Sequence, residues 1–187
     1  MDDIVKAAMQ KWPNVPHCYG WLGLDMRGQW YMRDDATQAL GGFNDSVKTR
    51  GSLLKHEKLV DFIQRNYQCD ATGPAKGQWY FQNGPQRVYV ELALTPFVWR
   101  VQSDFALASH TGLSSHLLTA WLDDVGRLYA ETPVGFGLIH TQDVLLASQA
   151  IEQGIWAVQE MPALDMPAAF NYVVSPLAQR QLSQFSK

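Results

Sequence analysis

Three short blocks of sequence occur twice in this chain in the same order, and this repetition limits the possible folds more than any other feature does. The spacing between blocks differs only where loops are expected. A single hairpin–helix–strand unit cannot bury both faces of its few strands. We therefore expect two diverged copies packed against each other. The matched segments are 21–31 with 121–129, 54–60 with 138–144 and 77–82 with 154–159, with Trp21 and Trp121, His56 and His140, and Trp79 and Trp156 in register.

The first block predicts a β-hairpin. Two aromatic-rich stretches within residues 19–33 flank the turn Asp25-Met-Arg-Gly28, where glycine supplies the positive φ that closes the turn. In the second copy Asp123 or Asp124 stands in the place of Asp25, and Gly126 stands in the place of Gly28. Either aspartate satisfies the pattern.

The remaining periodicity predicts helices and a meander of strands. Helices are expected over 2–12, 56–67, 141–153 and from Ser175-Pro176 to about residue 185. In the helix over 2–12, Asp2 or Asp3 is the expected cap, Trp12 lies on the apolar face and Pro13 ends the helix. Strands, including 96–101 and 170–174, follow one another at a spacing typical of antiparallel sheets. We predict an α+β fold of antiparallel sheets from two hairpin–helix–strand repeats, with N- and C-terminal helices. The expected parts are 1–102 and 103–187, forming one compact unit.

Composition excludes several classes of protein. Hydrophobic residues make up 47% of the 187 and charged residues 18%, as in globular proteins. No apolar run is long enough to cross a membrane, and the acidic start does not resemble a secretory signal, so we expect a cytoplasmic protein without membrane association.

The net charge of the chain is unevenly distributed. Residues 1–100 carry a net charge of +2 (12 Lys/Arg, 10 Asp/Glu) and the remaining residues carry −5. A net charge of +2 is too small for us to expect a nucleic-acid partner. Cys18 and Cys69 lie far apart and outside any CxxC or metal motif, so we expect free thiols.

The chain contains the pattern Trp-x-x-x-Asp-x-x-Gly-x-Trp-Tyr, an apolar helix, Gly-x-Trp-Tyr-Phe, a Pro-x-x-Val-x-Val-Glu strand and Pro-Phe-Val-x-Arg-Val. In this pattern it resembles a family of small proteobacterial proteins of unknown function. The matching residues are 21–31, 77–81, 85–91 and 96–101. The resemblance implies a β-rich two-repeat structure with a superficially pleckstrin-homology-like part. It implies a binding or signalling module and no established activity.

Aromatic, arginine and histidine side chains are the candidate site residues. In each adjacent aromatic pair on a strand, one ring points inward and the other outward, which offers either a binding platform or additional core. Arginines near strand ends suit a phosphate or carboxylate, or serve as solvated edge charges. The two repeat-related histidines at helix starts suit acid–base or ligand roles, or capping. These candidates are Trp30, Tyr31, Arg33, His56, Trp79, Tyr80, Arg87, Trp99 and His140.

These residues favour a non-enzymatic binding or signalling module of a bacterial cell, with a site between the repeats for a protein or a small anionic ligand. One alternative is a small enzyme that uses the His56/His140 pair with Asp25 or Asp124. Another is a structural homo-oligomer that pairs through sheet edges such as 97–102. No catalytic, nucleotide or metal motif is complete: His56-Glu57 begins a zincin pattern, but Val60 replaces its second histidine. We expect no cofactor and no metal.

Overall fold

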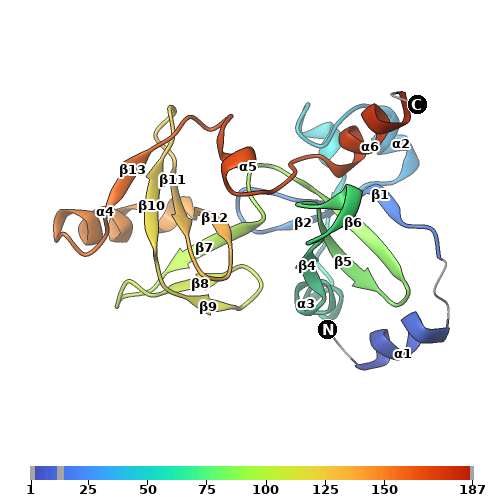
Figure 1. Ribbon diagram of the computed structural model, residues 1–187, viewed down its shortest axis with the longest axis horizontal. Coiled ribbons are helices and arrows are strands. Elements are labelled where there is room, and N and C mark those ends of the chain that lie inside the picture. Colours follow the sequence, from blue (N-terminus) through green and yellow to red (C-terminus); the bar gives the residue numbers. More distant parts are fainter. Residues whose placement is uncertain (1–2, 12–14, 186–187) are drawn as a thin grey trace. The chain divides into compact units, whose positions relative to one another are not determined.

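The computed structural model describes residues 3–11 and 15–185, which divide into two compact units (Figure 1). The first comprises residues up to Asp25, Gln29–Ala93 and residues from Tyr172 onward; the second comprises Met26–Gly28 and Leu94–Asn171. One boundary between the two units lies after Ala93, whereas the boundary expected from the sequence was residue 102. The C-terminal helix groups with the first unit because its start is bonded to a strand of that unit.

The first unit contains a six-stranded sheet in the order β3-β2-β1-β6-β5-β4. Every neighbouring pair is antiparallel except β1 with β6, which run parallel. The core of this unit contains Leu22, Leu24, Trp30, Ile63 and Phe81, all buried. The strands are β1 (Cys18–Leu24), β2 (Trp30–Met32), β3 (Ser52–Leu53), β4 (Tyr67–Cys69), β5 (Trp79–Asn83) and β6 (Gln86–Leu92).

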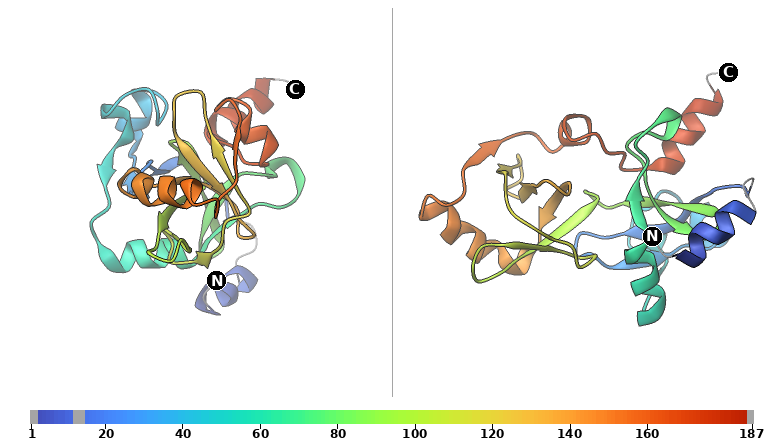
Figure 2. Two further views of the ribbon diagram at one scale, coloured as in Figure 1. Left: turned by 90° about the vertical axis from the view of Figure 1, so that its left-hand side faces the viewer. Right: turned by 60° about the horizontal axis from the view of Figure 1, so that its bottom comes forward.

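Helices α3 and α6 lie on opposite sides of these strands (Figures 1 and 2). The first turn of α6 is bonded to β6, because the Glu91 carboxylate accepts hydrogen bonds from Ser175 Oγ at 2.5 Å and from the Leu177 amide at 3.0 Å. Ser175 Oγ also accepts a bond from the Ala178 amide, which confirms the predicted cap. The helices of this unit are α1 (Asp3–Lys11), α2 (Asp35–Ala39), α3 (Glu57–Arg65) and α6 (Pro176–Phe185), with 3-10 turns at Lys48–Arg50 and Gly73–Ala75.

The second unit contains a seven-stranded sheet in the order β13-β10-β11-β12-β7-β8-β9. Here β10 and β13 run parallel, as do β12 and β7. Its strands are β7 (Phe97–Val101), β8 (Leu107–Ser109), β9 (Ser114–Ser115), β10 (Thr119–Leu122), β11 (Leu128–Glu131), β12 (Phe136–Ile139) and β13 (Val158–Glu160); its helices are a 3-10 turn at Thr141–Asp143, α4 (Val144–Glu152) and α5 (Met166–Ala169).

The α+β fold is confirmed, and both sheets are largely antiparallel. The order β3-β2-β1-β6 in one sheet has the same relative strand directions as β12-β11-β10-β13 in the other. The third sequence block does not keep this correspondence, because Trp79 begins β5, which lies one strand beyond β6, whereas Trp156 precedes β13.

The two hairpin turns share one hydrogen-bond pattern. Oδ1 of Asp25 accepts the amide of Gln29 at 2.8 Å, and Oδ1 of Asp123 accepts the amide of Arg127 at 2.7 Å. Asp123, not Asp124, is therefore the counterpart of Asp25. When Asp25 is aligned with Asp123, Trp121 aligns with Gly23 and not with Trp21. The tryptophan match predicted from the sequence is therefore displaced by two residues.

Three expected features differ or fall outside the described residues. Strand β7 is not a sheet edge, because β12 and β8 pair with it on either side. No strand forms over 170–174: α5 ends at Ala169, and Asn171 has φ +53°, which interrupts extension. The helix expected over 2–12 is α1, whereas Asp2, Trp12 and Pro13 lie outside the described residues.

Candidate functional site

A bulge in β1 forms one side of the candidate site. Cys18 pairs with Val88 and Leu22 with Val90, so five residues of β1 lie opposite three of β6. Gly20 has φ +77°, which lets the extra residues leave the ladder. As a result, the Trp21 side chain in the bulge stays 41% exposed in a strand that is otherwise mostly buried.

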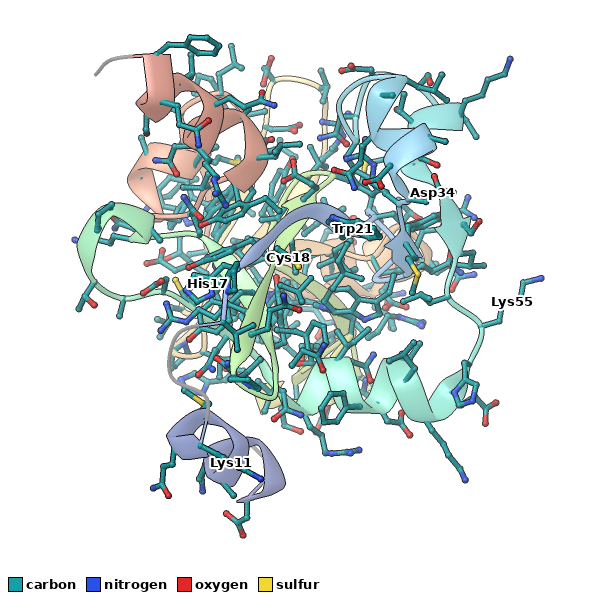
Figure 3. The ribbon with its side chains drawn as sticks, turned by 90° about the vertical axis from the view of Figure 1, so that its right-hand side faces the viewer. Lys11, His17, Cys18, Trp21, Asp34 and Lys55 are labelled. Carbon is teal, nitrogen blue, oxygen red and sulfur yellow. The ribbon has the colours of Figure 1, made fainter. Side chains whose placement is uncertain are left out.

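A pocket of about 270 Å³ lies beside this bulge, between β1, β2, β5, β6 and α3. Trp21 and Met32 are its exposed hydrophobic side chains, whereas Leu22, Ile63 and Phe81 are buried. Figure 3 shows Cys18 and Trp21 on the same strand. We call this cavity the Trp21 pocket; its lining is Cys18, Trp21, Leu22, Met32, Leu54, Leu59, Ile63, Phe81, Asn83, Gln86 and Val88.

The chemistry of the Trp21 pocket is apolar and uncharged. None of the described residues that line it is Asp, Glu, Lys, Arg or His. Burial raises the pKa of the Cys18 thiol, which keeps it protonated and a poor nucleophile near neutral pH. The remaining polar groups are the side-chain amides of Asn83 and Gln86, and the Gln86 amide already donates to the Pro16 carbonyl at 2.9 Å. The pocket is therefore suited to hold an apolar group and not to perform acid–base chemistry.

The first predicted pair, Trp30 and Tyr31, divides between core and surface. Trp30 is 1% exposed, with its ring edge-on to Tyr67 at 5.2 Å. Tyr31 is half-buried; its ring packs near Phe43 and its hydroxyl donates to Asp25 Oδ2 at 3.4 Å. Neither side chain lines the Trp21 pocket.

Arg33 is fully buried and is bonded to backbone. Its Nε donates to the Thr49 carbonyl at 2.7 Å, Nη1 to Gly20 at 3.1 Å and Nη2 to Gly41 at 2.5 Å. Burial lowers the pKa of this guanidinium, although Glu91 and Asp45 oppose the shift. Arg33 thus ties the 41–50 loop to the bulge that carries Trp21.

Tyr80 and Arg87 are the predicted residues that the fold brings together. The Arg87 guanidinium lies 4.6 Å from the centroid of the Tyr80 ring, and its Nη1 donates to Asp70 Oδ2 at 2.5 Å. Tyr89 also donates to that carboxylate oxygen, at 3.1 Å. Desolvation lowers the pKa of Arg87, but the hydrogen bond to Tyr89 and the neighbouring anionic groups outweigh it, so the net shift is upward. The nearby Trp79 is half-buried against Tyr67 at 4.9 Å.

The two histidines cap helical turns, and they belong to different units. His56 Nδ1 accepts the Leu59 amide at the start of α3 at 3.3 Å, and His140 Nδ1 accepts the Gln142 amide at 3.1 Å. His56 is exposed, whereas His140 is 9% exposed. Trp99, in the second unit, is fully buried beside Phe97.

The described residues contain no group of three or more His, Cys, Asp or Glu side chains that could hold a metal ion. Within the same part of the chain, no helix combines the length and the apolar character that a membrane crossing requires.

The model of the DUF2944 family, described as a protein of unknown function (DUF2946), matches residues 1–184. The chain belongs to this family. No curated protein matches it.

Two crystal structures of DUF1285 family proteins are similar to this DUF2944 member. The protein from Silicibacter pomeroyi DSS-3 has 13% identity and a TM-score of 0.46, covering 80% of this chain and 84% of its own. The protein from Shewanella baltica OS155 has 12% identity and a TM-score of 0.45, covering 69% of this chain and 91% of its own.

Sequence reasoning missed Cys18, Trp21 and Met32 as site residues of this DUF2944 member. A glycine inside an aromatic strand, as in Tyr19-Gly20-Trp21, often marks a bulge and was the available signal. The pocket itself had no local signal, because α3 and β6 reach it from distant parts of the sequence.

Proposed function

We propose that this chain is a non-enzymatic binding module, and that the Trp21 pocket receives an apolar side chain from a partner protein. The observation that carries the proposal is an indole left 41% exposed beside a buried apolar floor. Exposed tryptophan and methionine side chains at one small cavity are typical of interface centres. A location in the bacterial cytoplasm is part of this proposal.

The size of the pocket favours a side chain over a larger ligand. Its volume of about 270 Å³ lies below the range of about 300–1,000 Å³ typical of small-molecule sites. The uncharged lining favours an apolar group over an anion.

An adjacent sheet edge supports a protein partner. Strand β3 is an edge of the first sheet, and its Ser52 pairs with Met32, which lines the pocket. An extended segment that paired with β3 would bring alternate side chains close to the cavity. The proposed site therefore lies within the first unit and uses Trp21 in place of the Trp30–Tyr31 pair. The enzyme alternative gains no support, because the Nδ1 atoms of His56 and His140 both accept helix amides.

Selection of displayed random peptides on the immobilised full chain tests this proposal. We expect selected peptides to share an apolar anchor and to bind the Trp21→Ser variant about 30-fold more weakly, as for an interface hot spot of about 2 kcal/mol. The matched control is Phe185→Ser, because Phe185 is 89% exposed on α6 in the same unit and does not line the pocket. Equal affinity for the wild type and Trp21→Ser would contradict the proposal.

Alkylation of the two thiols gives a second measurement. Cys18 lines the pocket and Cys69, on β4, does not. A bound peptide should slow the reaction of Cys18 with N-ethylmaleimide and leave that of Cys69 unchanged, as followed by peptide mass mapping. Protection of neither thiol would place the peptide elsewhere on the chain.

A further inference from the structure

A second pocket, of about 260 Å³, lies within the second unit and differs in chemistry from the Trp21 pocket. It is bounded by the hairpin tip Met26–Gly28, the turn before β11, strand β12 and the first residues of the helical segment that begins at Thr141. We call it the two-arginine pocket. Its lining combines the cations Arg27 and Arg127 with an apolar surface.

The charged residues that line this pocket are Arg27 and Arg127. The described residues that line it include no Asp or Glu. Arg127 Nη1 lies 3.5 Å from Asp123 Oδ2, and the Arg127 side chain is 41% exposed. A contact of 3.5 Å is longer than a strong charge-assisted hydrogen bond of about 2.7–2.9 Å. Because a guanidinium has five N–H donors, Arg127 can bind an anion while it keeps its contact with Asp123.

Apart from the exposed Thr141, the remainder of the lining carries no polar side chain and is partly open. Leu138 and Ile139 are buried, whereas Met26 is 37% and Val144 41% exposed. Val144 is the first residue of α4, and together with Met26 it forms the partly open apolar part of the lining. An anionic head with an aliphatic tail therefore matches both parts of the lining.

We propose that the two-arginine pocket binds a small aliphatic carboxylate. The carboxylate lies against Arg27 and Arg127, which present the planar N–H donors that suit it. The aliphatic tail packs on Met26 and Val144. The cavity volume limits the tail to a short or medium length, since it lies below the range of about 300–1,000 Å³ for larger ligands. This site is independent of the Trp21 pocket, so either proposal can fail alone.

Calorimetric titration of the full chain with octanoate, 1-octanol and acetate tests the proposal. Octanoate carries both chemical groups, octanol lacks the charge and acetate lacks the tail. We expect saturable binding of octanoate, and dissociation constants at least about tenfold higher for the other two compounds. Octanol binding as tightly as octanoate, or an absence of saturable octanoate binding, would overturn the proposal.

A matched pair of variants locates the site. Val144→Asp places a carboxylate in the lining, and Leu145→Asp places the same charge at the next residue, which is 72% exposed and does not line the pocket. An acidic residue in the first turn of a helix is favourable, so both variants should fold. We expect Val144→Asp to weaken octanoate binding at least about tenfold and Leu145→Asp to change it less than about twofold. Equal effects of the two variants would overturn the assignment.

Discussion

The hydroxyl of Tyr129 donates a 2.8 Å hydrogen bond to Oδ2 of Asp123, while Oδ1 of the same carboxylate accepts the backbone amide at the end of the turn. In the first unit, Tyr31 donates to Asp25 Oδ2 in the same arrangement at 3.4 Å. One aspartate thus holds each hairpin turn and the second strand that leaves it.

Removing the two tyrosine hydroxyls should cost unequal amounts of stability. Tyr129 is 1% exposed and its bond to Asp123 is short, so Tyr129→Phe should lower the free energy of unfolding by about 1.5–3 kcal/mol. Tyr31 is half-buried and its bond is long, so Tyr31→Phe should cost less than about 1 kcal/mol. Urea denaturation measures both. A larger loss for Tyr31→Phe would contradict the account.

Gly20 should tolerate a side chain poorly, because its φ of +77° strains any other residue and a Cβ would displace the ends of two neighbouring side chains. A Cβ at this position would lie 2.5 Å from Gln38 Oε1 and 2.9 Å from Leu177 Cδ2. We expect Gly20→Ala to cost at least about 2 kcal/mol and to weaken binding of any peptide selected for the Trp21 pocket. Gly73→Ala is the control in the same unit: its φ of +71° is similar and nothing lies within 4 Å, so thermal unfolding should show a loss of only about 1 kcal/mol.

Replacing Arg33 with lysine should be destabilising although the charge is kept. A single ammonium cannot reach the carbonyls of Thr49, Gly20 and Gly41 together, and a buried carbonyl left without a donor is costly. We expect Arg33→Lys to lower the free energy of unfolding by about 2–4 kcal/mol. The exposed Arg65, replaced in the same way, should change it by less than about 0.5 kcal/mol. Similar losses in the two variants would show that the guanidinium geometry of Arg33 is unimportant.

Glu91 should make part of the stability dependent on pH. Burial raises the pKa of this carboxyl above its unfolded value, although the hydrogen bonds from Ser175 and Leu177 oppose the shift. A raised carboxyl pKa favours the folded state fully below the unfolded pKa of about 4.3, and this contribution is lost as pH rises through the folded pKa. The unfolding free energy of the wild type minus that of Glu91→Gln should therefore fall as pH rises from about 4. Urea titrations at several pH values test the sign, and a difference that grows with pH would refute it.

Local sequence was sufficient where one turn or one cap determines the structure. Asp25 and Gly28 predicted the first hairpin, and Ser175-Pro176 predicted the start of α6, because the bonding groups lie within a few residues of each other. Local pattern failed at 170–174. An apolar stretch there suggested a strand, but Asn171 adopts a positive φ, and the Val173 amide donates to Gly77, about a hundred residues away.

By itself, the sequence determined the α+β class, the hairpin turns and the helix starts, because these depend on periodicity and on neighbouring residues. Tertiary structure alone decided that Arg33 is buried and that Trp21 is exposed. The carbonyls that bind Arg33, and the strand β6 against which β1 bulges, come from separate segments of the chain. Whether a side chain faces solvent depends on what those segments cover, and no local pattern contains that information.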